Sequence, residues 1–516
     1  MARPIGKVLI VGGGTAGWLA GAYLARRLGA QRPGGVEITL IESSDIAIVG
    51  VGEGTFPSIK KLVLALGVEE AAFMRACSAA FKQGFRFVDW AQAPTGGRHS
   101  HYYHPFNLPE ATKTGLDLLP YWLMGVAGKT PLSQALAVQD AACDAGKGPK
   151  RLDERPFFGS MNYAYHFDAG RLAAWLAQVG QGLGVKRLIG NVEAVNLGED
   201  GAIACVSTRE HGALTADLYI DCTGFRAELI GKALGSPFRG VGQHLFVDRA
   251  LAVQAPYDRP DHPIATTTIS TAKAAGWVWD IGLNNRRGVG YVYSSRHTTD
   301  DDARAVLYDY LGPAGEGLDL HRQLKFTLGF RERPWVKNCV AIGLSGGFLE
   351  PLESTGISMI DMSLEMLADT LPRTVEAMDP AARAFGAAMT RRFELAVDFL
   401  KMHYCLSRRT DSRFWTDNAD PASWTQSLAD KLALWASRPP AAYDFTSTLD
   451  CFASSSYKYI LYGMGFATDM EGALARHSYV DEARREFERI RVLAAHSAAN
   501  LPDHRALIDH LYAEAR

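Results

Sequence analysis

The chain lacks a bias in charge, an array of paired cysteines and a long apolar run. Its 54 lysine and arginine residues are nearly matched by 56 aspartate and glutamate residues, which gives a formal net charge of −2. A chain without a basic field does not attract phosphate backbones, so nucleic acid is not expected as a partner. No run of about 18 apolar residues occurs, so no membrane span is expected.

The N-terminus also lacks the charged leader, apolar stretch and cleavage site of a signal peptide. Seven cysteines lie singly and form no CxxC pair, which argues against a disulfide framework and fits a reducing compartment. A cytoplasmic location is therefore expected. His99, His101 and His104 form an HxHxxH pattern, but no cysteine or histidine at ligand spacing accompanies it, so no metal site is expected.

The first 42 residues predict a βαβ unit. Residues 7–11 form a short β-branched run that is typical of a buried parallel strand. Residues 18–28 carry apolar side chains at helical spacing, and residues 36–41 predict the next strand, which ends at Glu42. A GxGxxG motif lies between the first strand and the helix, and this context predicts a dinucleotide site.

Each glycine of that motif has its own expected role. Gly12 permits a tight turn, Gly14 lets a pyrophosphate approach the backbone, and Gly17 lets helix and strand pack closely. The helix start offers N–H groups and a favourable dipole to an anion, and Glu42 is placed to accept from ribose hydroxyls. The candidate cofactor residues here are Gly12, Gly14, Thr15, Ala16, Gly17 and Glu42.

The motif alone does not distinguish NAD from FAD, but two later segments do. Residues 216–225 resemble the second characteristic stretch of FAD monooxygenase-type folds, and residues 338–356 resemble their third, where a strand end and a helix start meet the isoalloxazine. The hydroxylases of that superfamily usually carry Gly-Asp near the third stretch. Residues 343–347 lack the aspartate, so an aromatic hydroxylase is less favoured.

Three further segments resemble the flavin-dependent tryptophan halogenase family. Lys82 stands in the family's Ala-Phe-Lys context, and Glu353 stands in its Phe-x-x-Pro-x-x-Ser-x-Gly pattern. The resemblance covers most of the chain: it is strong over residues 7–110 and 270–365 and weaker in the C-terminal part. Trp277, Trp279 and Ile281 match the motif Trp-x-Trp-x-Ile-Pro, with Gly282 in place of the proline, which puts the rigidity of that turn in question.

The resemblance implies a reaction as well as a cofactor. In this family reduced FAD and O2 convert bound halide into hypohalous acid, which crosses an internal tunnel to a lysine beside the substrate. Lys82 would then hold the acid as an ammonium, or be halogenated as a free amine, and both routes stay open. Glu353 would accept the ring proton or orient the halogen donor, with Ser354 as a further catalytic candidate. Thr355 and Gly356 match the halide site at a helix start, for which Ser354 or Thr355 is the expected N-cap.

The resemblance also implies flavin and substrate contacts. Leu344 and Ile357 match flavin-contacting positions, and Val192 is a further candidate. His104 and Phe106 match positions that sandwich an indole, and the two tryptophans would separate the flavin from the substrate. Where tryptophan-specific members place a tryptophan and residues that grip the amino-acid backbone, this chain has Phe452 and serines. Free tryptophan is therefore expected to bind poorly, in favour of another indole, a phenol-like ring or an indole on a larger scaffold.

The expected fold class is α/β: a Rossmann-type FAD-binding domain of the flavin monooxygenase-like superfamily, with an interleaved second sheet and a mostly helical C-terminal part. Residues 1–365 are expected to form the FAD-binding and halogenation module, with a substrate-facing sheet inserted at about 60–330, and residues 366–516 a helical substrate cap. Segments 192–206, 245–253 and 288–293 are expected to share the second sheet. Residues 95–104 and 145–155 are expected to be surface loops.

Only one GxGxxG follows a strand, so a site for NAD(P)H is not evident. FADH2 is therefore expected from a separate NAD(P)H flavin reductase, with O2, chloride or bromide, and a small aromatic molecule as co-substrates. A homodimer is a family-based expectation. The first rival is a single-component FAD aromatic monooxygenase, which would oxidise NAD(P)H alone. The second is a non-catalytic flavin-binding protein, which would not need Lys82 or Glu353.

Overall fold

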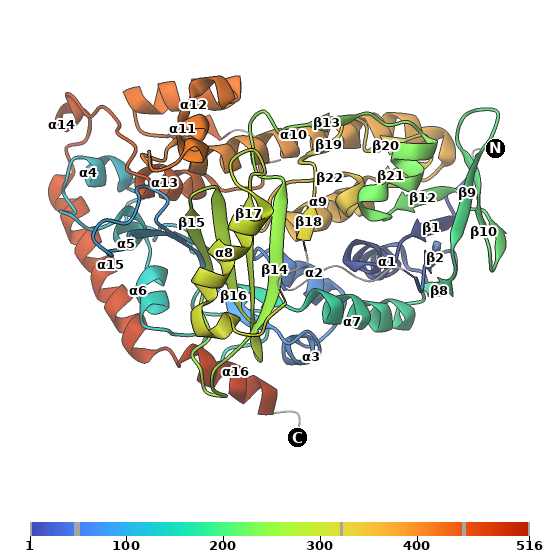
Figure 1. Ribbon diagram of the computed structural model, residues 1–516, viewed down its shortest axis with the longest axis horizontal. Coiled ribbons are helices and arrows are strands. Elements are labelled where there is room, and N and C mark those ends of the chain that lie inside the picture. The colour runs from blue at the N-terminus through green and yellow to red at the C-terminus, as the bar shows by residue number, and fades with distance from the viewer. Residues whose placement is uncertain (1–2, 46–51, 320–322, 446–449, 514–516) are drawn as a thin grey trace. The chain divides into compact units, whose positions relative to one another are not determined.

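The computed structural model describes residues 3–45, 52–319, 323–445 and 450–513 (Figure 1). The chain divides into two compact units, each made of three stretches. Unit 1 comprises Met1–Ala79, Phe167–Val241 and Thr327–Glu394, and unit 2 comprises Ala80–His166, Gly242–Phe326 and Leu395–Arg516. The boundary expected after residue 365 falls inside helix α9 (Thr355–Thr370). The units interleave in sequence because parallel strands need long crossover connections, which can carry segments of another unit.

Unit 1 is built on a six-stranded sheet in the order β20-β21-β12-β1-β2-β8. Its neighbours pair in parallel except for the antiparallel edge pair β20–β21. The predicted βαβ unit is confirmed, with the helix beginning at Thr15. The strands are β1 (Lys7–Val11), β2 (Glu37–Glu42), β8 (Lys186–Ile189), β12 (Leu218–Asp221), β20 (Trp335–Val336) and β21 (Cys339–Ala341).

Helices and two small sheets complete unit 1. Helix α1 packs against both α7 and α9. The helices of this unit are α1 (Thr15–Leu28), α2 (Ile59–Ala65), α3 (Glu70–Ala76), α7 (Ala169–Gly182) and α9. The remaining strands are β3 (Glu53–Gly54), the sheet β11-β10-β9 (Gly212–Leu214, Ile203–Thr208, Val192–Leu197) and the sheet β13-β19-β22 (Phe238–Gly240, Gly329–Arg331, Gly347–Phe348).

Unit 2 is built on a seven-stranded sheet in the order β18-β14-β17-β16-β15-β5-β6. Every neighbouring pair is antiparallel except β15–β5. Outside this sheet, β4 (Ala80–Lys82) pairs antiparallel with β7 (Ala164–Phe167). The sheet's strands are β5 (Gly84–Val88), β6 (His101–Pro105), β14 (Arg249–Pro256), β15 (Thr268–Lys273), β16 (Gly276–Gly282), β17 (Arg286–Tyr293) and β18 (Gln323–Lys325).

Two sequence-based expectations are wrong here. Segment 192–206 belongs to a three-stranded sheet of unit 1, whereas segments 245–253 and 288–293 supply β14 and β17 of unit 2. Residues 101–104 are not a surface loop, because they form β6 and pair with β5. Tyr102 and Tyr103 favour a strand, but the loop-like residues before them hide this signal, and pairing with β5 supplies the hydrogen bonds of the strand.

The two faces of the unit 2 sheet differ in chemistry. On one face Val278, Val289 and Tyr291 form an apolar cluster with Leu307 of α8 (Asp300–Leu311), which crosses these strands in Figure 1. Directly opposed residues share a face, so the strand register defines the other side. We call it the aromatic face, and it carries Phe85, Phe87, Tyr102, His104, Trp277 and Trp279.

Most of the remaining helices of unit 2 lie in the C-terminal part of the chain, which is mostly helical as expected. Helix α10 (Met378–Cys405) contributes to both units. None of the helices among the described residues is long and apolar enough to cross a membrane. The other helices are α4 (Leu119–Leu123), α5 (Leu132–Leu136), α6 (Gln139–Asp144), α11 (Arg413–Ala419), α12 (Gln426–Ser437), α13 (Ser454–Gly463), α14 (Ala473–Arg476), α15 (Val480–Asn500) and α16 (His504–Ala513).

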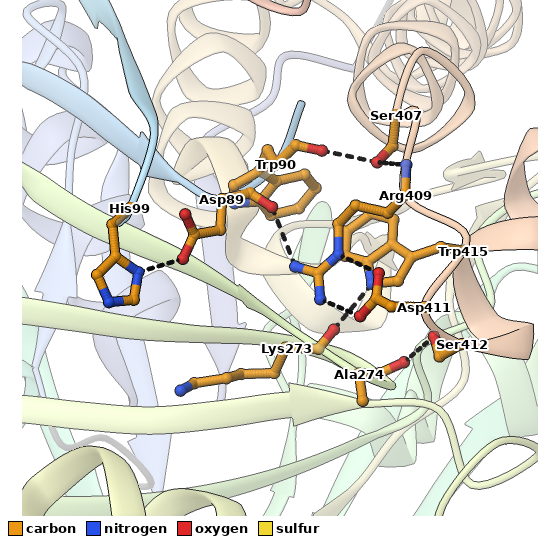
Figure 2. Close-up of polar contacts among 10 residues, drawn as sticks. All are labelled: Asp89, Trp90, His99, Lys273, Ala274, Ser407, Arg409, Asp411, Ser412 and Trp415. Carbon is orange, nitrogen blue, oxygen red and sulfur yellow. Dashed lines mark hydrogen bonds and ion pairs between the residues drawn. The ribbon is translucent and has the colours of Figure 1, made fainter. Parts of the chain in front are cut away.

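Arg409, in the turn after α10, fastens that turn to the end of β5 (Figure 2). Its Nε and Nη2 donate to both carboxylate oxygens of Asp411 at 2.9 and 2.7 Å, and its Nη1 donates to the carbonyl of Asp89 at 3.0 Å. The guanidinium also lies 4.8 Å from the centre of the Trp415 ring. Only arginine has the planar fork that makes these contacts together.

Neighbouring groups extend this attachment to the sheet (Figure 2). The Ser407 hydroxyl donates to the carbonyl of Trp90 at 2.6 Å, and the Trp415 indole N–H donates to the carbonyl of Lys273 at 3.0 Å. Asp89 itself has a left-handed backbone, with φ at 59°. Its carboxylate accepts the Ser100 N–H at 3.0 Å and contacts His99 Nδ1 at 2.6 Å, which stabilises that turn.

Replacing Arg409 with lysine is expected to lower the free energy of unfolding by about 1–3 kcal/mol, because a single ammonium leaves at least one buried acceptor without its donor. Denaturant unfolding would measure the change. Arg413→Lys is the matched control, since that side chain is 87% exposed and its change should stay within about 0.5 kcal/mol. Equal effects of the two substitutions would contradict the assignment.

Candidate functional site

The glycines between β1 and α1 have very different surroundings. Gly12 has φ +113°, and a Cβ there would lie 2.2 Å from the carbonyl oxygen of Cys222. A Cβ at Gly17 would lie 1.8 Å from the carbonyl oxygen of Gly12, so helix and turn pack without space for a side chain. At Gly14, by contrast, no atom of the described residues beyond its own chain neighbours lies within 4 Å of the added carbon. Gly14 is therefore where a ligand can approach the backbone.

The start of α1 suits an anion. Gly14 is its N-cap and supplies no capping side chain, and the first turn contains no acidic residue. The N–H groups of a first helical turn have no acceptor within the helix, and the helix dipole adds partial positive charge. The backbone turn at Gly343 lies against this helix start, because a Cβ at Gly343 would be 2.7 Å from Cβ of Ala16.

Glu42 already has two partners at the end of β2. Its Oε1 accepts from Arg187 Nε at 2.6 Å, and its Oε2 accepts from the indole N–H of Trp18 at 3.1 Å. A carboxylate has about four acceptor positions, so both oxygens retain capacity for a hydroxyl donor. The glycine turn, the uncapped helix start and this oriented carboxylate therefore fit an adenine dinucleotide such as FAD.

The three other cofactor candidates differ in exposure. Leu344 lies in the short helical turn Gly343–Ser345 and is 39% exposed, so its side chain is open to a ligand. Ile357 is buried in the first turn of α9. Val192 begins β9 and packs against the apolar cluster under that sheet, which accounts for it without a ligand. Their contacts to a flavin stay predictions.

Glu353 is the last residue of a short 3₁₀ turn (Pro351–Glu353) that lies immediately before α9. Glu353 is fully buried, and Thr355 and Gly356 open the helix. Ser354 is the N-cap, but with φ 52° and ψ 37° it has a left-handed backbone and makes no capping hydrogen bond with its side chain. The expected N-cap position is therefore confirmed at Ser354, but its side chain does not cap the helix, and its backbone conformation costs about 1 kcal/mol or more in a non-glycine residue.

Lys82 is fully buried at the end of β4. Its Nζ lies 3.7 Å from the centre of the Phe85 ring and 5.5 Å from that of Phe106. The His104 imidazole stacks on the same Phe85 ring at 5.6 Å with an interplanar angle of 18°, and Phe106 meets it edge-on at 5.9 Å. The structure therefore gathers Lys82, His104 and Phe106 around the ring of Phe85, one of the phenylalanines that flank Lys82 in the sequence.

Phe452 lies in a second aromatic group beside His104. It stacks on Phe399 of α10 with ring centres 3.8 Å apart and an angle of 15°. Phe399 lies 6.0 Å from His104, and Tyr459 of α13 lies 6.5 Å from it. Tyr457 meets Phe399 edge-on at 4.8 Å. Sequence reasoning missed Phe399 and Tyr459 because apolar positions in helices carry no motif.

The tryptophan motif forms β16. Trp277 is buried, and its ring centre lies 6.4 Å from that of Trp279, as expected for alternate residues of one strand. A Cβ at Gly282 would lie 2.7 Å from a methyl carbon of Ile264, so the position is tightly packed rather than loose. Ile281 is buried in the same strand. The proposed separation of flavin and substrate by the tryptophans stays a prediction.

His99, before β6, and His101, its first residue, have separate surroundings. His99 contacts Asp89, and His101 lies 3.4 Å from a guanidinium nitrogen of Arg86. Burial, and then the Arg86 charge, lower the pKa of His101. Within the described ranges no group of three histidine, cysteine, aspartate or glutamate side chains is arranged to hold a metal ion.

Comparison with known proteins gives consistent matches along nearly the whole chain. The family model described as tryptophan halogenase matches residues 7–479. Tryptophan 6-halogenase SttH of Streptomyces toxytricini is 36% identical over 482 residues, which are 89% of each chain. A tryptophan halogenase from Shewanella frigidimarina NCIMB 400 superimposes with a TM-score of 0.95 at 38% identity, over 99% of this chain and 98% of that one. Tar14, a tryptophan C-6 flavin-dependent halogenase (chlorinase) from taromycin biosynthesis, gives 0.91 at 36% identity over 98% and 100%.

Alanine at Gly14 and at Gly17 should separate ligand binding from folding. Gly17→Ala is expected to lower the free energy of unfolding by about 1–3 kcal/mol or more through overpacking. Gly14→Ala should leave stability within about 0.5 kcal/mol but weaken FAD binding about tenfold, because its methyl group occupies the approach to the backbone. Fluorescence titration with FAD and thermal unfolding measure the two effects. Unchanged FAD affinity in Gly14→Ala would contradict this placement of the site.

Proposed function

Because the chain belongs to the tryptophan halogenase family, we propose that it halogenates an electron-rich aromatic ring with Lys82 and Glu353 as its principal catalytic residues. It is a flavin-dependent enzyme whose co-substrates are FADH2, O2 and a halide. A hydroxylase and a non-catalytic flavin-binding protein are both less consistent with this membership. The substrate and the residue roles are the parts that need experiment.

Unit 1 is proposed to hold the cofactor in a Rossmann-type site. The N–H groups at the start of α1 would bind the pyrophosphate, with Gly14 allowing the approach and Glu42 accepting from a ribose hydroxyl. Bound FADH2, with O2, supplies the oxidation of halide to hypohalous acid. The start of α9 at Thr355 and Gly356 is proposed to hold the halide through backbone N–H groups, since an anion is favoured at a helix N-terminus.

The observation that carries the catalytic proposal is the surroundings of Lys82. A lysine without solvent contact lies 3.7 Å from the centre of the Phe85 ring, and His104 stacks on the same ring. The face of an aromatic ring stabilises an ammonium that has lost its water. Such an ammonium has N–H groups to donate to the oxygen of hypohalous acid, and that hydrogen bond polarises the oxygen–halogen bond.

The proposed transfer balances with two protein groups. The halogen leaves the oxygen of the acid and bonds to a ring carbon, and the ring proton then passes to the Glu353 carboxylate. The hydroxide released from the acid takes a proton from the Lys82 ammonium and becomes water. Ser354 follows Glu353 directly, and its constrained backbone is proposed to orient that carboxylate. A net transfer of this proton from Glu353 to Lys82 restores both groups before the next turnover.

The proposed substrate is indole or an indole derivative other than free tryptophan. The faces and edges of His104, Phe106 and Tyr459 suit a flat ring. One face of the Phe452 ring stacks on Phe399, and the Phe452 side chain has no polar atom that could bind the amino-acid group of tryptophan. Removing a carboxylate and an ammonium from water without partners costs several kcal/mol, which favours rings that lack them.

A separate flavin reductase is the general source of FADH2 in this family, and the aromatic substrate completes the reaction. A homodimer and a cytoplasmic location stay predictions. Chloride and bromide are both retained as candidate halides, because selectivity between them depends on small differences in cavity size and dehydration.

Replacing Lys82 with methionine should abolish halogenated product, by at least about 100-fold, while hypohalous acid still forms, because the N–H donors are lost and the side-chain volume is largely kept. Product is measured by mass spectrometry, and the acid by halogenation of a β-diketone scavenger. Lys150→Met is the matched control: Lys150 is also a buried lysine of unit 2, and its Nζ donates to the Arg155 carbonyl at 2.8 Å. Undiminished product from Lys82→Met would refute the role.

Competition between indole and L-tryptophan tests the substrate class. With FAD, a flavin reductase, NADH, O2 and either chloride or bromide, kcat/KM for indole is expected to exceed that for tryptophan about tenfold or more, because the amino-acid group is left unpaired. Mass spectrometry of both products measures the ratio. A preference for L-tryptophan would show that this part of the proposal is wrong while leaving the halogenase assignment intact.

A further inference from the structure

His166 and Thr268 lie beside Lys82 but have no part in the chemistry described so far. His166 is on β7, which pairs antiparallel with β4, so that His166 lies opposite Ala80 and Ala164 lies opposite Lys82. Opposed residues, and residues two apart on one strand, share a face. The side chains of Lys82 and His166 therefore lie diagonally on the same face of this strand pair.

A buried hydrogen bond connects this strand pair to the large sheet. His166 Nε2 lies 2.8 Å from Thr268 Oγ1, and both side chains are buried. Thr268 lies directly opposite Phe85 in the parallel pair of β15 and β5. Phe85 is the residue whose ring holds Nζ of Lys82 at 3.7 Å. This hydrogen bond thus joins β7, the partner of the strand that carries Lys82, to β15, the partner of the strand that carries Phe85.

We propose that His166 and Thr268 are positioning residues that hold Lys82 over Phe85 for halogen transfer. Three contacts connect the strand of Lys82 to the strand of Phe85. Strand β4 pairs with β7, His166 of β7 forms a hydrogen bond with Thr268 of β15, and β15 pairs with β5. The backbone N–H of Gln83, the residue between the two ends, also donates to Thr266 at 2.8 Å. A lysine side chain has four rotatable bonds, so a fixed relation between its strand and the ring limits where Nζ lies.

The charge state of the histidine fits this role. Burial lowers the pKa of His166 well below its usual range, and the charge of Lys82 and then His504 act in the same direction, against the carbonyl of Gly282. The imidazole is therefore neutral at ordinary pH, and it adds no second positive charge beside the ammonium. A neutral ring with so low a basicity is a poor proton acceptor, which favours a positioning role over general base catalysis.

The test measures how much of the hypohalous acid reaches the substrate, and it rests on the proposed function. Purified enzyme turns over indole in the presence of a β-diketone scavenger, and the partition is halogenated indole divided by the sum of both halogenated products. Thr268→Val keeps the side-chain shape and removes the hydroxyl. We expect its partition to fall about tenfold, since a misplacement of about 1 Å can cost up to a hundredfold, with total acid formed within twofold of wild type. Thr268→Ser should restore the partition.

His504→Leu is the matched control for loss of a buried histidine next to β4. His504 lies 6.2 Å from Phe81, which precedes Lys82 and points to the other face of the strand. This variant should lower the melting temperature but leave the partition unchanged. Both products in the partition arise only from enzyme molecules that have formed hypohalous acid, so a fraction of unfolded enzyme does not alter the ratio.

A wild-type partition in Thr268→Val overturns the proposal, and so does an equal fall in Thr268→Ser, because the hydroxyl would then not be the cause. Lys82→Met distinguishes this failure from failure of the proposed function. If Lys82→Met loses the partition and Thr268→Val keeps it, only the positioning role is wrong. If Lys82→Met also keeps it, the proposed role of the lysine itself is wrong.

Discussion

The candidate site of unit 2 depends on the register of β5 between β15 and β6. That register sets Thr268 on one side of Phe85 and His104 on the other, and it leaves the ring face to Lys82. Removing an ammonium from water costs several kcal/mol, and a cation–π contact with a desolvated ring returns about 2 kcal/mol of that cost. The site therefore needs a precisely held ring. A slip of one residue would turn Phe85 to the α8 side of the sheet and leave the lysine without it.

The same sheet can serve as scaffold and site because its two faces do different work. The α8 face is a packed apolar cluster around Leu307, which anchors β14, β16 and β17. The aromatic face presents flat rings with polar edges, among them His104 and Trp279. The Arg409 fork and its neighbours attach the turn after α10 to this sheet, so that Phe399 of α10, which stacks on Phe452, lies on a helix whose end is fixed. Rigidity on one face supports specificity on the other.

Two helix starts of unit 1 share one structural feature, the absence of a side-chain cap. At α1 the N-cap is Gly14, which has no side chain, and at α9 it is Ser354, whose side chain does not cap the helix. In both places no N-cap side chain bonds the N–H groups of the first turn, which is consistent with the proposed pyrophosphate and halide sites. The strained backbone of Ser354 is consistent with a functional position, since strain of about 1–3 kcal/mol persists where the surrounding structure enforces it.

The sequence by itself determined what is local. GxGxxG after a β-branched run specified the turn, its open glycine and the helix start, because close approach of backbones allows no other residue type at Gly12 and Gly17. The motifs around Lys82 and Glu353 indicated the chemistry and the family. Local signals also misled: residues 101–104 look like a polar loop, and Ser354 looks like an ordinary cap.

Only the tertiary structure decided which distant residues meet. Phe85, Thr268 and His166 come together through strand pairing, and Phe399 reaches His104 from a helix about 300 positions later. Strand register and helix packing depend on the free energy of the whole unit, so no window of the sequence contains them. Short motifs therefore indicate the reaction, while the position of Lys82 over Phe85 depends on the pairing of strands in the folded unit.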